Sequence, residues 1–285
     1  MIYSIENEFL KVSVKEFGCE LTSIISKETG YEYMWQGNPE IWSGQSPILF
    51  PIIGRLIDDR YTLNGKEYEM PKHGFARRMK WEFIEKKSDS IKMRLSENEA
   101  TLKIYPYCFD LVVTFTLDGR RLTVSHDITN KNDKTMYFSI GAHPAFNCAI
   151  GDKLTFDENE TLETIKIDLE KSLRLPGTYP VMKEENDLTI TQDIFKEDAL
   201  IFNNVRSQNV TLRSDSHNRT IRFNLGNAPY LGIWAKPGAP YVCIEPWYGV
   251  NDSSEKKPDF SQKDAINPIL ATRSFNFTWF AEFSE

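Results

Sequence analysis

Short segments in which apolar and polar residues alternate recur along the 285-residue chain, and this period of two constrains its fold more than any other feature. Such alternation is typical of a β-strand with one buried face. Several of these segments are joined by tight-turn residues: Asn64-Gly65 connects 61–63 to 66–68, and Asp118-Gly119 follows 111–117. Because Asn-Gly and Asp-Gly favour two-residue hairpin turns, the pattern predicts antiparallel strand pairs.

Helical periodicity is scarce, and only 39–42 and 191–197 suggest a turn or two of helix. A dozen or more strands with few short helices predict an all-β protein, most simply a large antiparallel β-sandwich. The chain has no Gly/Ser-rich linker, no repeat of fixed period and no low-complexity tract. We therefore expect residues 1–285 to form one domain.

The charge and composition of the chain exclude several classes of function. The net charge is −7 and no long run of Lys or Arg occurs, so we expect no nucleic-acid partner. No apolar stretch approaches the length of a membrane span, and Glu6 and Glu8 interrupt the N-terminal segment where a signal peptide is continuously apolar. The four cysteines have no CxxC spacing, which favours reduced thiols and a cytoplasmic location.

His143 is the histidine best placed for chemistry. In 137–147, alternation puts large apolar side chains on one face and Ser139, Gly141 and His143 on the other. A small polar face suits a groove better than a core, and Pro144 ends the strand ladder directly after His143. His126, in contrast, shares its face with apolar residues and is expected to be a core histidine.

Glu245 shares a strand face with Tyr241 and Cys243, and Pro246 and Trp247 follow it. A carboxylate at the end of an apolar strand is costly without a purpose, which favours a functional role over a surface one. Three further residues support a ligand site. His73 lies in a loop beside Gly74, Arg55 is the one charge in a long apolar run, and Trp234 lies on an otherwise polar strand face.

Four motifs occur in the order and spacing of the aldose 1-epimerase (galactose mutarotase-like) family, and the chain is most similar to its LacX-like branch. They are Gly54-Arg55, His73-Gly74-Phe75, 141–147 (Gly-Ala-His-Pro-Ala-Phe-Asn) and 244–247 (Ile-Glu-Pro-Trp). The resemblance covers nearly the whole chain. It implies the family's large β-sandwich and the interconversion of α- and β-anomers of a hexose, with no metal or organic cofactor.

By this resemblance Glu245 is the general base and His143 the general acid, and His73 and Arg55 hold the sugar's hydroxyls and ring oxygen. We expect Trp234 to stack on the sugar ring. The motif around His143 departs from the family's Asn-His-x-Tyr-Phe pattern. No residue matches the family's substrate-binding Asp, which is expected near Trp234 and Lys236.

Other functions use the same residues. Lys72, Arg77 and Arg78 beside His73 leave room for a phosphorylated sugar, which would make the chain a hexose-6-phosphate epimerase of the same fold. His73, His143 and Glu245 have the residue types of a two-histidine, one-carboxylate metal site. A third alternative is a carbohydrate-binding protein that has kept the fold without catalysis. The sequence does not distinguish a monomer from a homodimer, and the expected partner is a small sugar.

Overall fold

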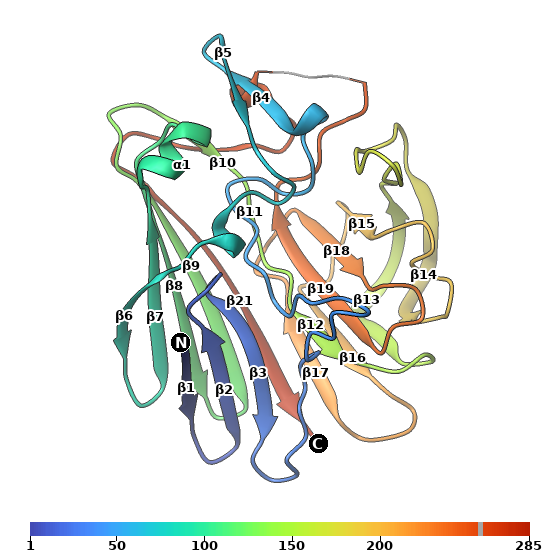
Figure 1. The fold of residues 1–285 in the computed structure, drawn as a ribbon. Helices are drawn as coiled ribbons and strands as arrows, with labels where there is room; N and C mark the ends of the chain where they lie inside the picture. Colours follow the sequence, from blue (N-terminus) through green and yellow to red (C-terminus); the bar gives the residue numbers. More distant parts are fainter. Residues whose placement is uncertain (256–258) are drawn as a thin grey trace.

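The computed structural model describes residues 1–255 and 259–285, and most of its regular structure is antiparallel β-sheet (Figure 1). One sheet has nine strands. In spatial order they are β14 (Tyr179–Thr189), β13 (Lys153–Thr164), β16 (Asn209–Arg213), β17 (Thr220–Asn224), β21 (Ser274–Ser284), β9 (Arg121–Asn130), β8 (Phe109–Asp118), β7 (Ser90–Ser96) and β6 (Glu82–Lys86). In Figure 1 this sheet extends from β6 on the left to β14 on the right.

A second sheet carries two of the four sequence motifs, 141–147 and 244–247. Its order is β11 (Ile140–Gly141), β19 (Tyr241–Tyr248), β18 (Tyr230–Trp234) and β15 (Leu200–Phe202), and β12 (Ala145–Asn147) also pairs with β19. Smaller sheets pair β1 (Ile2–Glu6), β2 (Leu10–Lys15) and β3 (Glu20–Ser26), β4 (Arg60–Leu63) with β5 (Lys66–Glu69), and β10 (Met136–Phe138) with β20 (Asn267–Ile269). The prediction of an all-β, antiparallel sandwich with few short helices is confirmed.

Helices are few and short. They are α1 (Glu99–Ile104) and the 3₁₀ helices η1 (Ile57–Asp59), η2 (Ala76–Arg78) and η3 (Phe260–Gln262). The segments 39–42 and 191–197, for which helical turns were expected, form turns without helix. Among the described residues, no helix is both long and apolar enough to cross a lipid bilayer.

The hairpin β8–β9 shows how the alternation builds the fold. Residues at every second position of β8 are buried, and the same holds for β9 up to Asn130. The predicted hairpin forms, but its turn lies one residue later than expected: Asp118 ends β8 opposite Arg121, and Gly119 and Arg120 form the turn, with Gly119 at φ +54°. His126 is 1% exposed within β9 and stacks on Phe277 of β21, so the expected core histidine is confirmed.

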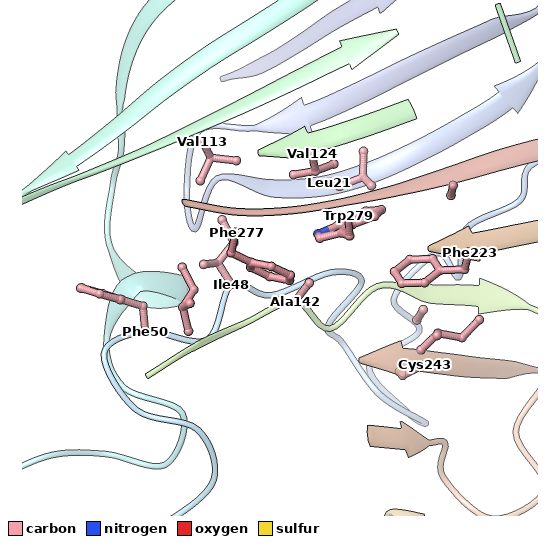
Figure 2. Packing of buried hydrophobic residues seen from close by; sticks show 14 of the residues in the cluster. Leu21, Ile48, Phe50, Val113, Val124, Ala142, Phe223, Cys243, Phe277 and Trp279 are labelled. Carbon is pink, nitrogen blue, oxygen red and sulfur yellow. The ribbon is translucent and has the colours of Figure 1, made fainter. Parts of the chain in front are cut away.

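The core lies between the nine-stranded sheet and the segments that carry the motifs (Figure 2). Trp279 of β21 is 2% exposed and stacks on Phe223 of β17, with ring centroids 5.0 Å apart. Ala142 packs on the same side of the core and is 4% exposed (Figure 2). Because Ala142 is anchored in this core, the next residue, His143, is held on a rigid support.

Candidate active site

A cavity of about 310 Å³ opens beside the second sheet. Four of the five predicted site residues line it: Glu245, His143, His73 and Trp234. The complete lining is Trp42, Lys72, His73, Arg77, His143, Ile167, Asp198, Ala199, Ile201, Trp234, Glu245, Trp247 and Asn251. An open pocket with apolar walls and a few converging polar groups has the character of a small-molecule site.

Strand register places His143 opposite Glu245. In the antiparallel pairing of β11 and β12 with β19, Gly141 faces Trp247 and Ala145 faces Cys243. Residue 143, midway between the two paired positions, therefore faces residue 245. The two side chains meet, with Nε2 of His143 3.1 Å from Oε2 of Glu245. Two motifs that are about a hundred residues apart in sequence thus bring an imidazole and a carboxyl group into contact.

Both groups of the pair lie in an environment that opposes charge. Glu245 is 1% exposed, and among the described residues its carboxyl oxygens make no hydrogen bond of good geometry, although the Trp247 indole lies close enough to lower the pKa of Glu245 against the larger effect of burial. Burial raises the pKa of Glu245 well above its usual range and lowers the pKa of His143 to about 3. Because each group disfavours its charged form, the pair holds one proton in total around neutral pH.

The imidazole of His73 is oriented by a backbone donor. Its Nδ1 accepts the N–H of Gly54 at 3.1 Å, so a neutral His73 carries its proton on Nε2. Burial, the neighbouring His143 and then Lys72 lower the pKa of His73 well below its usual value, which keeps the ring neutral. The structure therefore presents His73 as a hydrogen-bond donor to the pocket.

Gly54 is required at its position for two reasons. It has φ +67°, a conformation that side chains disfavour, and a Cβ atom there would lie 2.0 Å from Cγ of Asn251. Asn251 is 4% exposed, lines the cavity, and donates from Nδ2 to the carbonyl of Ser172 at 2.7 Å. The glycine of the Gly54-Arg55 motif thus lets the loops of His73 and Asn251 meet.

Aromatic rings enclose His143. The Trp42 indole stacks on the imidazole, with centroids 5.2 Å apart and planes 27° apart, and Trp234 meets it edge-on at 5.8 Å. Trp42 also stacks on Tyr241 at 5.5 Å. The main-chain carbonyl of Trp42 accepts the indole N–H of Trp35 at 2.9 Å, which fixes this loop. Trp42 was not identified from the sequence, because it lies outside any strand pattern.

Two cations and a second carboxylate line the pocket. Nη2 of Arg77 donates to the carbonyl of Lys72 at 3.1 Å, whereas its Nε has no partner. Within residues 1–255 and 259–285, neither Lys72 nor Arg77 lies within ion-pair distance of a carboxylate. Asp198, at φ +74° before β15, is the carboxylate in the lining besides Glu245. It follows a stretch of turns with no sequence motif and lies far in sequence from Trp234 and Lys236, where a substrate-binding Asp was expected.

Arg55 lies outside the cavity lining. Its guanidinium donates to both carboxyl oxygens of Asp59, from Nε at 2.7 Å and from Nη2 at 2.6 Å. Its side chain is 38% exposed. The role of Arg55 on the sugar stays a prediction, and Lys72 and Arg77 are the cations that the fold places at the pocket.

The metal-ligand group suggested by the sequence, His73, His143 and Glu245, differs from the group that lies close together in the structure. Among the described residues, one group of three metal-ligand types lies close together, and it consists of His143, Cys243 and Glu245. His73 is not a member, and its Nδ1 already accepts the N–H of Gly54.

The model of the aldose 1-epimerase family matches residues 1–260, and the chain belongs to this family. Among curated proteins, it is 34% identical to the plasmid-encoded protein LacX of Lactococcus lactis subsp. lactis, and the match covers 95% of both chains. It is 33% identical to the chromosomal LacX of that organism, and this match also covers 95% of both chains.

Two solved structures are similar to this chain both in sequence and in fold. A galactose mutarotase related enzyme from Lactobacillus acidophilus is 34% identical, with a TM-score of 0.93 over 100% of this chain and 98% of that one. A galactose mutarotase-like protein from Lactobacillus casei is 30% identical, with a TM-score of 0.95 over 100% of both chains. The predicted resemblance to the aldose 1-epimerase family and its LacX branch is confirmed.

Proposed function

We propose that the protein is an aldose 1-epimerase that interconverts the α- and β-anomers of a hexose. One observation carries this proposal: His143 and Glu245 face each other across the β12–β19 register at 3.1 Å, at the wall of an open pocket. Anomer exchange needs one group that accepts the proton of the C1 hydroxyl and one that donates a proton to the ring oxygen. A carbohydrate-binding protein needs neither.

In the proposed mechanism, sugar binding activates the pair. Hydroxyl groups of the sugar donate to the buried carboxyl of Glu245, which makes no hydrogen bond of good geometry among the described residues of the free protein. Hydrogen bonds to a carboxylate favour its ionised form, so the shared proton moves to His143. Glu245 then has the charge of a base and His143 that of an acid, although the pair as a whole stays neutral.

The reaction follows from this state. Glu245 takes the proton of the C1 hydroxyl while His143 gives its proton to O5, and the C1–O5 bond breaks to leave the open-chain aldehyde. Rotation about C1–C2 turns the other face of the carbonyl toward O5. The same transfers in reverse close the ring as the other anomer, so the chain ends with the protons it began with.

The remaining wall of the pocket is suited to hold a sugar ring. We assign the Nε2–H of His73 to a sugar oxygen and the carboxylate of Asp198 to sugar hydroxyl groups. Trp234 and Trp42 offer aromatic surface to the apolar face of the ring. The unpaired state of all four cysteines supports a reducing location such as the cytoplasm.

A hexose phosphate is the second candidate substrate, and Lys72 and Arg77 favour it. Both line the cavity with no carboxylate partner among the described residues, and Arg77 leaves Nε unsatisfied. Two cations without an ion-pair partner in a sugar-sized pocket suit a phosphoryl group, since Arg and Lys are the usual donors to phosphate.

Polarimetry or NMR exchange on fresh α-glucose, α-galactose and hexose 6-phosphates tests the reaction. We expect wild-type protein to accelerate at least one of them, and Glu245→Gln or His143→Asn to lower kcat by about 10²–10⁴-fold. Glu85→Gln and His217→Asn make the same chemical changes outside the pocket and should leave the rate unchanged. If the wild type binds sugars without accelerating exchange, the binding-protein alternative replaces the epimerase.

Arg77→Gln, compared with Arg78→Gln, tests the choice of substrate. Arg78 is exposed and does not line the pocket, so it is a matched control. If the substrate is phosphorylated, Arg77→Gln lowers kcat/KM for the 6-phosphate much more than for the free hexose. Equal effects on both sugars would reject the phosphorylated substrate.

A further inference from the structure

A thiol completes a cluster of metal-binding groups around the acid–base pair. His143, Cys243 and Glu245 each offer one ligand atom, and these atoms all lie within 4.8 Å of one another. Cys243 and Glu245 lie two residues apart on one face of β19, and Ala145, two residues after His143, is the register partner of Cys243. The cluster is therefore fixed by rigid strands and not by a mobile loop.

The geometry approaches that of a tetrahedral zinc ion. Zn–N and Zn–O bonds of about 2.0–2.2 Å and a Zn–S bond of about 2.3 Å place neighbouring ligand atoms roughly 3.3–3.6 Å apart. Nε2 of His143 and Oε2 of Glu245 are already 3.1 Å apart. Movements of about 1 Å bring three ligands to bonding distance of one ion. The fourth coordination position would face the cavity that His143 and Glu245 line.

The carboxyl group of Glu245 supplies an independent sign that a cation fits here. It is 1% exposed, and among the described residues its oxygens make no hydrogen bond of good geometry, although Nε2 of His143 lies 3.1 Å from Oε2. Burial raises the pKa of this carboxyl group, and a cation beside it would stabilise its ionised form.

The kind of ion follows from the ligands. A thiol, an imidazole and a single carboxylate form a soft, mixed set that suits Zn²⁺. Mg²⁺ and Ca²⁺ prefer oxygen ligands, and this cluster offers one carboxylate beside a thiol and an imidazole.

We propose that His143, Cys243 and Glu245 form a reversible inhibitory site for Zn²⁺ or a similar thiophilic divalent cation. The ion would bind the two groups that transfer protons, so it would compete with the sugar; this competition rests on the proposed function, whereas the binding itself does not. Zinc binding releases the thiol proton and the one proton of the His143–Glu245 pair into solution, about two protons per ion.

Calorimetric titration of the whole protein with ZnCl₂ tests this site. We expect one ion per chain, and titrations in buffers of different ionisation enthalpy should show the release of about two protons. Cys243→Ala should release one proton fewer and weaken binding by at least about 10–100-fold, the loss that removal of even an outer-shell partner of a metal ligand causes. MgCl₂ should give no binding at the same concentrations.

Cys108→Ala is the matched control, because it removes a partly exposed thiol that is outside the cluster. We expect it to bind Zn²⁺ as the wild type does. Equal affinity of Cys243→Ala and wild type, or loss of binding in Cys108→Ala, would overturn the proposal. Cys243→Ser, checked by thermal unfolding, separates loss of the ligand from loss of core packing.

Competition is measured separately, with the sugar whose exchange the protein accelerates. Zn²⁺ should raise KM without changing kcat in the wild type, and Cys243→Ala should show this effect only at much higher zinc concentration. Stoichiometric zinc binding without any sugar turnover would leave the metal site standing and reject the epimerase function.

Discussion

His143 and Glu245 occupy opposite positions of an antiparallel ladder, and Nε2 of the histidine lies 3.1 Å from Oε2 of the carboxyl group. Burial favours the uncharged form of each. In the unfolded chain their pKa values are about 6.5 and 4.5, so the unfolded pair binds two protons at low pH, one between these values and none above. The folded pair keeps one proton across this range.

We therefore expect this pair to favour the folded state most between about pH 4.5 and 6.5. Below this range the unfolded chain binds more protons, and stability falls as the pH falls; above it the folded chain binds more, and stability falls as the pH rises. Glu245→Gln should abolish the alkaline decline and leave the protein more stable than wild type at pH 8. Chemical unfolding from pH 4 to 9 measures this, and parallel alkaline slopes in the two proteins would contradict it.

Trp42 should control the orientation of His143. Because its indole stacks on the imidazole at 5.2 Å, Trp42→Ala frees the ring to rotate away from Glu245. A misplacement of about 1 Å costs about 10²-fold in rate, so we expect a fall in kcat of this order. Trp42→Phe keeps an aromatic face and should retain most of the activity. If the alanine variant keeps the kcat and pH profile of the wild type, the stack has no positioning role.

Gly54→Ala should displace a side chain that lines the pocket, in addition to straining the backbone at residue 54. The added Cβ would meet the Asn251 side chain, whose Nδ2 donates to Ser172. Gly65→Ala is the matched control, because Gly65 also has positive φ and its Cβ would meet nothing within 4 Å. We expect Gly54→Ala to be less stable than Gly65→Ala by about 1–3 kcal/mol, the cost of a lost buried hydrogen bond, and to lose activity. Equal stability by urea unfolding would show that the close approach is not required.

His126 should make folding sensitive to acid independently of the pocket. Burial lowers its pKa to about 4 from 6.5, so the unfolded chain binds one more proton between these values. Stability falls as the pH drops through this window, by up to about 3 kcal/mol from this residue. His126→Asn should remove that part of the acid sensitivity, whereas His217→Asn in the turn 214–218 should not. Unfolding at pH 7 and pH 4 compares the three proteins.

Alternation identified many of the strands, among them β8 and β9, but it missed others, including β3 and two strands at one edge of the large sheet. β13 and β14 were not recognised, although they are among the longest strands. Much of β14 is exposed on both sides. In β13 every second residue from 154 to 164 is buried except Glu158, but Glu158 and Glu160 are charged, so the sequence shows no continuous apolar face. Pairing with β16 on one side of β13 holds them in the sheet. Helix α1 has a capping box at Asn98 and Thr101, but with six residues it is too short for a helical period.

The sequence predicted those residues of the candidate site that lie in recognisable patterns, and it missed the others. Glu245, His143, His73 and Trp234 lie on or beside patterned strands and motifs, so their residue types were informative. The pairing of residue 143 with residue 245 depends on a register between strands that are distant in sequence, which a single sequence does not contain. Asp198 lies in an irregular segment with no motif, so only the folded chain shows that it lines the pocket.

The register that joins β11 and β12 to β19 also governs when the candidate site is complete. The lining of the cavity extends from Trp42 to Asn251, and its proton-transfer pair forms only after β19 has docked beside strands made about a hundred residues earlier. A nascent chain that has not yet exposed β19 outside the ribosome has His143 and part of the lining, but it lacks Glu245 and the lining residues Trp247 and Asn251. Non-local pairings of this kind form late and slowly. Under the proposed function, the time at which sugar turnover begins during synthesis or refolding would therefore show when the last step of folding is complete.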